Sequence, residues 1–273
     1  MKNLSIILPT YNRAPMLGAA VDSVLAQTVP DFELLIVDDA STDDTEAVVM
    51  AYRDERIRYI RAEQNGGAAA ARNLGIRSVS EETELIAFED SDDLWYPDKL
   101  EKQLKEMDSH PEAGFCYHKI AYDMGNGARA ILPDERVEVS KKRGDIYAQL
   151  LYDNLVPCPA LLVRRNVLTE AGPFDVMLRA LEDYDLALRL ARIAPAAFVD
   201  EILLDSSFST TGVSGSPVNY LTASCLLLGK YKTDYLKTDT FNHRVEIILR
   251  DAERAGVKEQ ITAFLEKILT LPG

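Results

Sequence analysis

The chain has 273 residues, of which 47% are hydrophobic, and this is enough to bury a substantial core. Its length fits one large α/β domain with a tail or two smaller domains, and we favour the first. A net charge of −14 and a pI near 4.7 give a negative average field, which would repel the phosphates of nucleic acid and an anionic membrane surface. We therefore expect no nucleic-acid partner.

The sequence has no recognisable targeting or transmembrane segment. The apolar part of MKNLSIILPTYNR is too short for a signal peptide, and no apolar run is long enough to span a bilayer. Cys116, Cys158 and Cys225 are odd in number and far apart, which favours buried free thiols over disulfides or a zinc site. We expect a cytoplasmic protein, either free or peripheral to a membrane.

Short apolar runs alternate with helical patterns in the first part of the chain. The runs cover Leu4–Leu8, Phe32–Val37, Ile57–Ile60 and Glu84–Phe88. The helical stretches between them are Ala14–Gln27, Thr42–Arg53 and Ala68–Val79. This alternation predicts an α/β fold with a doubly wound, mostly parallel central sheet and helices on both faces. Such sheets bind ligands beyond the carboxyl ends of their strands.

A polar cluster follows each of these predicted strands. The clusters are Pro9-Thr10-Tyr11-Asn12, Asp38-Asp39, Asn65-Gly66-Gly67 and Glu89-Asp90-Ser91-Asp92-Asp93. Each cluster alone is also explained by a turn or a helix cap, because these residue types favour such positions. Since all of them fall on one edge of the predicted sheet, together they indicate a ligand-binding cleft.

The second half of the chain has a less regular pattern. A helix is predicted after Pro97, because Leu100, Leu104 and Met107 keep helical spacing. The other predicted elements are a hairpin or irregular strands at Gly114–Met124 and Ala130–Leu132, a strand at Pro157–Val163, a helix at Leu181–Ala194, and two or three amphipathic helices from about Val218 to Leu269. We therefore expect antiparallel strands in this part of the sheet.

Asp90 and Asp92 form the most informative acidic pair. Separated by one serine, their carboxylates can turn toward a common point, where a cation would relieve their repulsion. Oxygen ligands without a Cys or His cluster favour Mg²⁺ or Mn²⁺ and leave positions for substrate phosphates. The alternative is an acidic surface loop. A GxGxxG fingerprint and a GxxxxGK[ST] loop are both absent, which counts against NAD enzymes and P-loop kinases.

An ordered set of motifs resembles the inverting family 2 glycosyltransferases of the GT-A fold. The motifs are SIILPTYNR, ELLIVDDASTDDT, NGGAAAARNLGI, AFEDSDDLWYPDKL and an FD pair followed by LEDYDLALRLA, over roughly residues 3 to 200. The resemblance implies a catalytic GT-A domain at 1–210 and a C-terminal helical extension at 211–273. It also implies glycosyl transfer from a nucleoside-diphosphate sugar, with a UDP-sugar favoured, to a hydroxyl of a carbohydrate, lipid-linked or other acceptor. Mg²⁺ or Mn²⁺ would be the cofactor, and polysaccharide biosynthesis the setting.

The same resemblance implies roles for individual residues. The base and ribose would lie against Pro9, Thr10, Tyr11 and Asp39, with Arg72 near the base or the diphosphate. Asp90 would hold the ribose or a metal-bound water, Asp92 would ligate the metal, and Asp183 would be the catalytic base. Glu182 and Trp95 would be secondary residues on the acceptor side.

Asp183 also has a purely structural explanation. Together with Glu182 and Asp185 it would complement the N-terminal dipole of the predicted helix, as acidic residues there do in any case. Spacing alone favours that explanation, whereas the family resemblance favours the base. The chain departs from the family beyond residue 200, where many relatives carry a Tyr-Arg pair and a His followed by a serine. Here Ser206, Ser207 and Ser209 stand in place of those charged groups.

Two other functions remain open at the level of sequence. A sugar-phosphate nucleotidyltransferase also has acidic metal ligands, but it needs a glycine-rich basic loop after its first strand, and PTYNRAPM offers only Arg13. A catalytically inactive nucleotide-sugar-binding partner subunit is compatible with the serine-rich loop, although the intact acidic motifs argue against it. The C-terminal helices could shape the acceptor site, form a homodimer or dock on a membrane complex.

Overall fold

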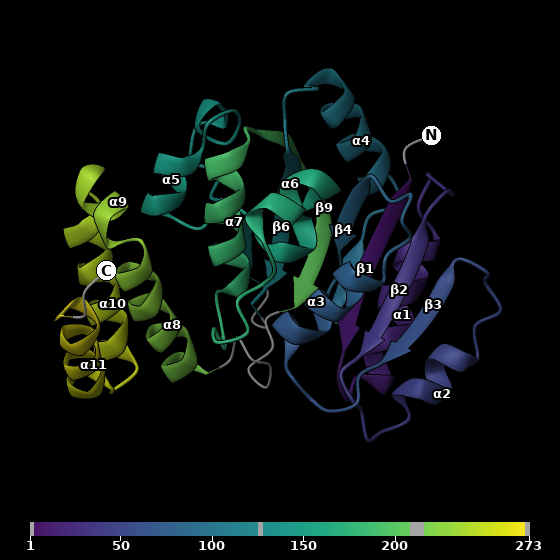
Figure 1. Cartoon of the computed structure of the whole chain (residues 1–273), viewed down its shortest axis with the longest axis horizontal. Coiled ribbons are helices and arrows are strands. Elements are labelled where there is room, and N and C mark those ends of the chain that lie inside the picture. Colours follow the sequence, from purple (N-terminus) through teal and green to yellow (C-terminus); the bar gives the residue numbers. More distant parts are fainter. Residues whose placement is uncertain (1–2, 125–127, 208–215, 271–273) are drawn as a thin grey trace.

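The computed structural model describes residues 3–124, 128–207 and 216–270 (Figure 1). Its first part has the predicted alternation of strands and helices. The strands are β1 (Leu4–Thr10), β2 (Glu33–Asp38), β3 (Ile57–Arg61) and β4 (Leu85–Phe88), and the helices are α1 (Ala14–Leu25), α2 (Thr45–Met50) and α3 (Ala68–Ser78). β1 pairs in parallel with both β2 and β4, and β2 pairs in parallel with β3. The predicted α/β class is confirmed.

β1 is the central strand of this parallel part. All seven of its residues are buried, as expected for a strand covered by helices on both faces. α3 lies against it at Gly75, where an added Cβ atom would come 2.5 Å from a side-chain carbon of Ile7. Glycine at this position therefore allows the close approach of helix and strand, and α3 carries Arg72 to the strand ends.

The second half adds antiparallel strands, as the sequence predicts. The strand order is β3-β2-β1-β4-β8-β6-β9-β5, with β7 paired to β6 off this path. The added strands are β5 (Asp93–Trp95), β6 (Phe115–Asp123), β7 (Arg129–Leu132), β8 (Leu162–Arg164) and β9 (Ala196–Ser207). β6 and β7 form the predicted hairpin. β8 runs antiparallel to β4 and β6, whereas β9 runs parallel to β6.

β9 is the longest strand and is not predicted from the sequence. Asp200 and Glu201 interrupt its apolar pattern, and the pairing with β6 shifts register beside His118 and Lys119. A β-bulge of this kind places an extra residue in the strand and breaks the period of two that marks a strand in sequence. The predicted strand at Pro157–Val163 is wrong in its first part, where Cys158–Ala160 form a 3-10 turn. Pro159 cannot donate a hydrogen bond to a sheet.

The remaining helices of the sheet region lie between these strands. They are α4 (Lys99–Ser109), α5 (Tyr147–Tyr152), α6 (Arg165–Ala171) and α7 (Glu182–Ile193). α4 and α7 match predicted helices, while α5 and α6 have only six and seven residues and are too short to give a clear period in sequence. A short 3-10 turn also covers Val139–Lys141.

The C-terminal helices gather on one side of the sheet (Figure 1). They are α8 (Pro217–Lys230), α9 (Lys232–Lys237), α10 (Phe241–Arg254) and α11 (Lys258–Thr270). The described part of the chain thus has four helices here, where the sequence predicts two or three. The predicted domain boundary at residue 210 lies outside the described residues. No helix in the described ranges is long and apolar enough to cross a membrane.

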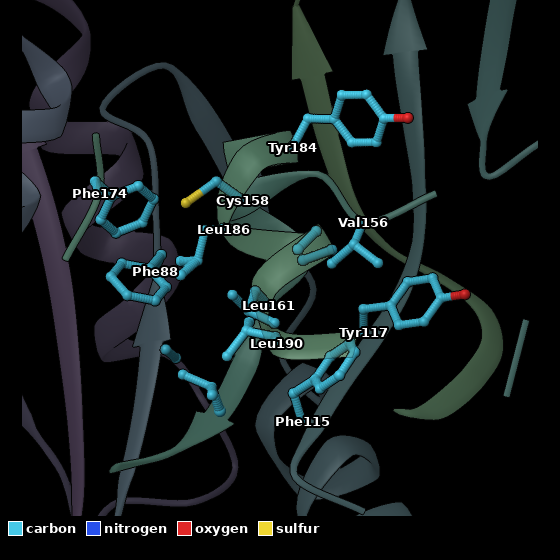
Figure 2. Close-up of a cluster of buried hydrophobic side chains, with 14 of the residues drawn as sticks. Phe88, Phe115, Tyr117, Val156, Cys158, Leu161, Phe174, Tyr184, Leu186 and Leu190 are labelled. Carbon is cyan, nitrogen blue, oxygen red and sulfur yellow. The ribbon is translucent and has the colours of Figure 1, made fainter. Parts of the chain in front are cut away.

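The hydrophobic core joins the end of β4 to the start of α7. Phe88 meets Phe174 edge to face, with ring centroids 5.4 Å apart. Figure 2 shows both rings in one cluster with Leu186 and Leu190 of α7. All three cysteines are buried and free, which confirms the expectation from the sequence. This packing fixes the position of the acidic residues after β4 relative to those at the start of α7.

Candidate active site

The ends of three neighbouring strands meet at one edge of the sheet. β1 lies between β2 and β4, so the segments after these strands are adjacent in space. Asn12, Ala40 and Leu181 have positive φ angles of 52°, 64° and 59°. Such angles are uncommon for residues other than glycine and gather at functional sites. Each of the three adjoins a residue that the sequence assigns to the site, namely Tyr11, Asp39 or Glu182.

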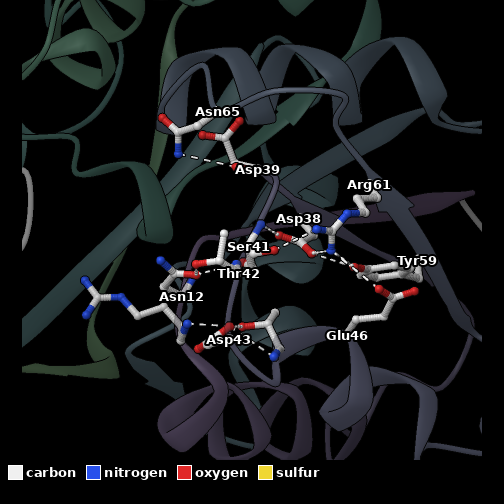
Figure 3. Close-up of polar contacts among 12 residues, drawn as sticks. Asn12, Asp38, Asp39, Ser41, Thr42, Asp43, Glu46, Tyr59, Arg61 and Asn65 are labelled. Atoms are coloured by element: carbon white, nitrogen blue, oxygen red, sulfur yellow. Dashed lines mark hydrogen bonds and ion pairs between the residues drawn. The ribbon is translucent and has the colours of Figure 1, made fainter.

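Asp38 organises the end of β2, whereas the sequence analysis assigned a role only to its neighbour Asp39. Its fully buried carboxylate accepts hydrogen bonds from Ser41 N–H at 2.8 Å and from Arg61 Nη1 at 3.0 Å, and also from the Tyr59 hydroxyl (Figure 3). The pairing register places Asp38 directly opposite Arg61. Asp38 therefore serves the loop rather than the open cleft, although Asp38 and Asp39 look alike in sequence.

Asp39 holds the loop after β3. One carboxylate oxygen accepts from the N–H of Gly67 at 2.7 Å, and both accept from the N–H of Gly66 at 2.9 and 3.1 Å. Burial raises the pKa of Asp39, while these two N–H groups lower it and the nearby Asp38 carboxylate raises it. The contact with Asn65 is through the Asp39 backbone oxygen (Figure 3). A carboxylate has about four acceptor positions, so Asp39 retains capacity for a base N–H.

The residues after β1 line the same edge. Pro9 and Thr10 are buried, and the Thr10 hydroxyl has no partner among the described residues. Tyr11 is 44% exposed. The Asn12 side chain accepts from the backbone N–H of Thr42 at 2.7 Å, and so ties the β1 and β2 loops together. These positions leave Tyr11 as an exposed aromatic ring at the strand ends.

Arg72 connects the segment Glu89-Asp90-Ser91-Asp92-Asp93 after β4, called the acidic loop below, to the start of α7. Its side chain is buried, and it donates from Nη2 to Asp90 at 2.6 Å and from Nη1 to Glu182 at 2.7 Å. The guanidinium also lies 5.5 Å from the ring centroid of Phe174. Because both terminal nitrogens of Arg72 are bound to carboxylates, its predicted contact with a base or diphosphate stays a prediction. The structure brings Asp90, Arg72 and Glu182 together into one chain of ion pairs.

The acidic loop concentrates negative charge. Burial raises the pKa of Asp92, the Asp90 carboxylate raises it further, and Arg13, 3.7 Å away, lowers it. Both carboxylate oxygens of Glu89 are buried and lack a partner among the described residues. Burial and Asp90 raise the pKa of Asp93, whereas a hydrogen bond with Ser206 lowers it. Ser209 and the rest of the serine-rich segment up to 215 lie outside the described residues.

A divalent cation at this loop would have to share its ligands with a substrate. No group of three or more Asp, Glu, His or Cys side chains among the described residues could hold a metal ion by itself. Mg²⁺ commonly binds through one or two carboxylates together with substrate phosphates. Asp92 is partly exposed and only loosely paired with Arg13, so its carboxylate is free to act in such an arrangement.

Asp183 lies at the first turn of α7. It is partly buried, and its two oxygens accept from the N–H of Cys158 at 3.3 Å and of Tyr184 at 2.7 Å. Burial raises the pKa of Asp183 to about 6, with a further rise from Glu182, while Arg72 and the two N–H groups lower it. A carboxylate with this pKa is a stronger base than an ordinary one and is still ionised near pH 7.

Two further aromatic residues adjoin the site. Trp95 is buried on β5, with the ammonium of Lys99 3.6 Å from its ring centroid, and its predicted acceptor role stays a prediction. Burial raises the pKa of Tyr122 on β6, and the carboxylates of Asp93 and Asp183 raise it further. Both the acidic loop and Asp183 therefore lie within electrostatic reach of Tyr122. Nothing in the local sequence marks it, because only the sheet pairing brings β6 to this edge.

Known proteins of related sequence are glycosyltransferases. The family described as Glycosyl transferase family 2 matches residues 5–169. An uncharacterised glycosyltransferase of Rickettsia typhi is 32% identical over 80% of this chain and 68% of its own. The UDP-Glc:alpha-D-GlcNAc-diphosphoundecaprenol beta-1,3-glucosyltransferase of Escherichia coli is 32% identical over 69% of this chain and 70% of its own.

Solved structures show the same fold. TarS 1–349 of S. aureus in complex with UDP-GlcNAc has a TM-score of 0.69 at 22% identity, over 93% of this chain and 72% of its own. The mannosyltransferase PcManGT of Pyrobaculum calidifontis, in complex with GDP-Man and Mn²⁺, has a TM-score of 0.66 at 18% identity, over 99% and 76%. These similarities confirm the GT-A type of sheet and helices.

Proposed function

The chain belongs to glycosyl transferase family 2, and from that premise we propose that it moves a glycosyl group from a nucleoside-diphosphate sugar to an acceptor hydroxyl with inversion. The observation that carries the proposal is the chain of ion pairs from Asp90 through Arg72 to Glu182, next to Asp183. It joins the acidic loop, which would hold the diphosphate side, to the start of α7, where Asp183 has a raised pKa. A UDP-sugar is favoured, because the E. coli relative is named for UDP-Glc.

The donor nucleotide lies at the β1 and β2 ends in this proposal. Asp39 accepts a hydrogen bond from the base, while the same carboxylate keeps Gly66 and Gly67 in place. Pro9 and Thr10 form the floor, and Tyr11 offers its exposed ring to the base. Asp90, held by Arg72, is positioned for the ribose or for a metal-bound water.

The leaving diphosphate lies next to Asp92. Asp92 would ligate the Mg²⁺ or Mn²⁺ ion, which when bound neutralises growing charge on the diphosphate as a Lewis acid. Arg13, 3.7 Å from Asp92, adds a second positive charge on this side. The ion also relieves the repulsion among the carboxylates of the acidic loop, which is why their crowding supports a metal-dependent reaction.

Asp183 accepts the proton of the acceptor hydroxyl as that hydroxyl attacks the anomeric carbon. Attack on the face opposite the diphosphate in a single displacement inverts the anomeric configuration. The two backbone N–H groups that bind Asp183 fix its direction, and a fixed direction matters because a general base must lie within about 2.6–3.2 Å of the proton donor. Arg72 keeps the neighbouring Glu182 turned toward Asp90.

A donor panel tests this function. The full chain is incubated with UDP-, GDP- and dTDP-sugars and with Mg²⁺ or Mn²⁺, and released nucleoside diphosphate is measured with binding by calorimetry. We expect metal-dependent release from one donor class. Tight donor binding without release under any condition would favour the inactive partner subunit. Formation of a nucleotide sugar from a nucleoside triphosphate and a sugar phosphate would favour the nucleotidyltransferase.

A further inference from the structure

Arg244 is one of two buried arginines among the described residues. It lies in the first turns of α10 and is 6% exposed, yet its guanidinium makes no hydrogen bond or ion pair with any described residue. Its one close ring contact is with Tyr184, 5.5 Å from the guanidinium carbon to the ring centroid. Arg72, the other buried arginine in the described ranges, binds two carboxylates.

This arrangement leaves donor capacity unused. A guanidinium has five N–H donors and no acceptor, and contact with an aromatic face satisfies its charge only in part. A buried charge without hydrogen-bonding partners is costly, so buried arginines normally have an anion beside them. Among the described residues, the guanidinium of Arg244 therefore has donor capacity left for an external group.

Three tyrosines and one carboxylate lie near the guanidinium. Burial lowers the pKa of Arg244, but Tyr184, Tyr235, Tyr220 and the Asp153 carboxylate raise it more, so these four side chains lie around the charge. Tyr184 and Tyr235 are fully buried and form the inner wall. Tyr220 is 38% exposed and Asp153 is exposed, so both of these side chains reach solvent.

The side chains near Arg244 adjoin Asp183, the proposed catalytic base. Tyr184 follows Asp183 directly in α7, and Figure 2 shows its hydroxyl pointing away from Phe88 and Phe174. Burial raises the pKa of Tyr220, Arg244 lowers it, and Asp153 and Asp183 raise it. Tyr220 of α8 therefore lies within electrostatic reach of both Arg244 and Asp183. Arg72 pairs with Glu182, the chain neighbour of Asp183, and with Asp90 of the acidic loop. None of the four side chains near Arg244 takes part in these ion pairs, so they are separate from the proposed diphosphate position.

We propose that Arg244, with the hydroxyl of Tyr220, binds a phosphate group of the glycosyl acceptor. The location on the acceptor side rests on the proposed function of Asp183. A phosphate suits the site, because its several oxygens can accept from the arginine fork and from the Tyr220 hydroxyl together. The phosphate belongs either to a soluble phosphorylated sugar or to a lipid headgroup, and the two share this chemistry.

An aromatic stack lies next to Asp153 and Arg244. Tyr152 and His243 lie parallel, with ring centroids 4.2 Å apart and an angle of 8° between the rings. They are the chain neighbours of Asp153 and Arg244, and Tyr152 is 49% exposed. The free face of Tyr152 offers an apolar platform for the ring of a sugar whose phosphate is bound by Arg244.

Binding of two phosphate probes tests the proposal. The full chain, saturated with UDP and Mg²⁺ so that the donor side is filled, is titrated with glucose 1-phosphate by calorimetry. It is also sedimented with phosphatidylcholine vesicles that contain or lack phosphatidic acid. Arg244→Gln should lose about ten- to a hundredfold in affinity for the probe that binds, because charge-assisted hydrogen bonds disappear. Arg254→Gln is the matched control on the same helix, where the side chain is 74% exposed, and it should bind normally.

A second variant covers the case in which Arg244→Gln does not fold. Tyr220→Phe removes one hydroxyl at the exposed rim, and we expect a several-fold loss of affinity for the same probe. Glucose 1-phosphate binding that depends on Arg244 identifies a soluble acceptor, and binding only to phosphatidic acid vesicles identifies a lipid headgroup.

The proposal is overturned if neither probe binds, or if both probes bind the Arg244 and Tyr220 variants as tightly as the wild type. UDP affinity is measured in the same experiment. Normal UDP binding with no effect of Arg244 counts against this site alone, whereas absent UDP binding counts against the proposed function.

Discussion

Asp183 combines two properties that work against each other in most carboxylates. Burial and the neighbouring Glu182 raise its pKa to about 6, which makes it a better proton acceptor. The N–H groups of Cys158 and Tyr184 stabilise its ionised form, and these bonds keep the pKa from rising further. A carboxylate at the start of a helix is common, so its surroundings rather than its position make it a candidate base.

The first prediction concerns the pH dependence of Asp183. Its protonated form cannot accept a proton, so kcat/KM should fall about tenfold per pH unit below about 6 and be level above that pH. Asp183→Asn keeps the shape, removes the basicity, and should lower turnover by about two to four orders of magnitude with little change in donor affinity.

Glu182→Gln is the matched control, and it should have a smaller effect on turnover if Asp183 is the base. Initial rates at saturating donor between pH 5 and about 8 provide the measurement. An Asp183→Asn enzyme with near-normal transfer, or with donor binding lost in parallel with turnover, would show that another group is the base.

The second prediction concerns Asp92. Asp92→Asn removes a charged oxygen without much change in size, so Mg²⁺-dependent affinity for UDP should fall by at least about tenfold while the fold is kept. Asp98→Asn is the same change at a more exposed residue directly before α4, and it should leave that affinity unaltered. Calorimetry with and without Mg²⁺ separates the two variants, and equal affinities would remove Asp92 from the metal site.

At the scale of elements, α7 is the link between the sheet and the C-terminal helices. Asp185 is fully buried and accepts from Arg189 Nε at 2.9 Å on its own helix. It also accepts from the Tyr231 hydroxyl at 2.8 Å and lies 2.7 Å from Lys230 Nζ at the end of α8. Lys230 further pairs with Asp175 in the loop before α7. The C-terminal helices therefore support the helix that carries Asp183.

The third prediction tests this link. Asp185→Asn should lower the free energy of unfolding by about 1.5–3 kcal/mol, because it removes the charge that several donors share. The loss is less than that of a fully enclosed pair, since the Lys230 side chain is 41% exposed. Asp251→Asn on α10 breaks only surface pairs with Arg250 and Arg254 and should cost less than about 1 kcal/mol. Urea unfolding of both variants gives the comparison, and equal losses would contradict the role of Asp185.

At the scale of the whole molecule, the negative charge acts on the donor as well. A chain of net charge −14 repels a nucleoside diphosphate at long range, while Arg13 and Arg72 act only close to the site. The donor must therefore approach against the average field, and local cations decide the final affinity.

The fourth prediction follows from that field. The association rate of UDP should rise as NaCl increases from about 10 to 150 mM, because the Debye length shrinks from about 30 to 8 Å and screens the repulsion. Stopped-flow measurements at constant Mg²⁺ would show this. A rate that falls with salt would mean that positive charge around the cleft outweighs the net charge of the chain.

The strand-and-helix order of the first ninety or so residues was determined by sequence alone, because apolar runs of strand length alternate with helical spacing there. The same pattern determined which residues lie at the strand ends, and hence the acidic loop and Asp39 as candidates. Local sequence also sufficed for the start of α7, where Glu182 and Asp183 precede an apolar helix.

Only the tertiary structure decided how these candidates meet. The pairing of Arg72 with Asp90 and Glu182 joins residues far apart in the chain, and no local pattern encodes such a contact. A bulge in β9 obscured its strand pattern in the sequence. Tyr122 comes near Asp183, and Arg244 near Tyr184, only because of how β6 and α10 pack. Periodicity reports which face of an element is buried, whereas the partners of a buried side chain depend on how the elements are packed together.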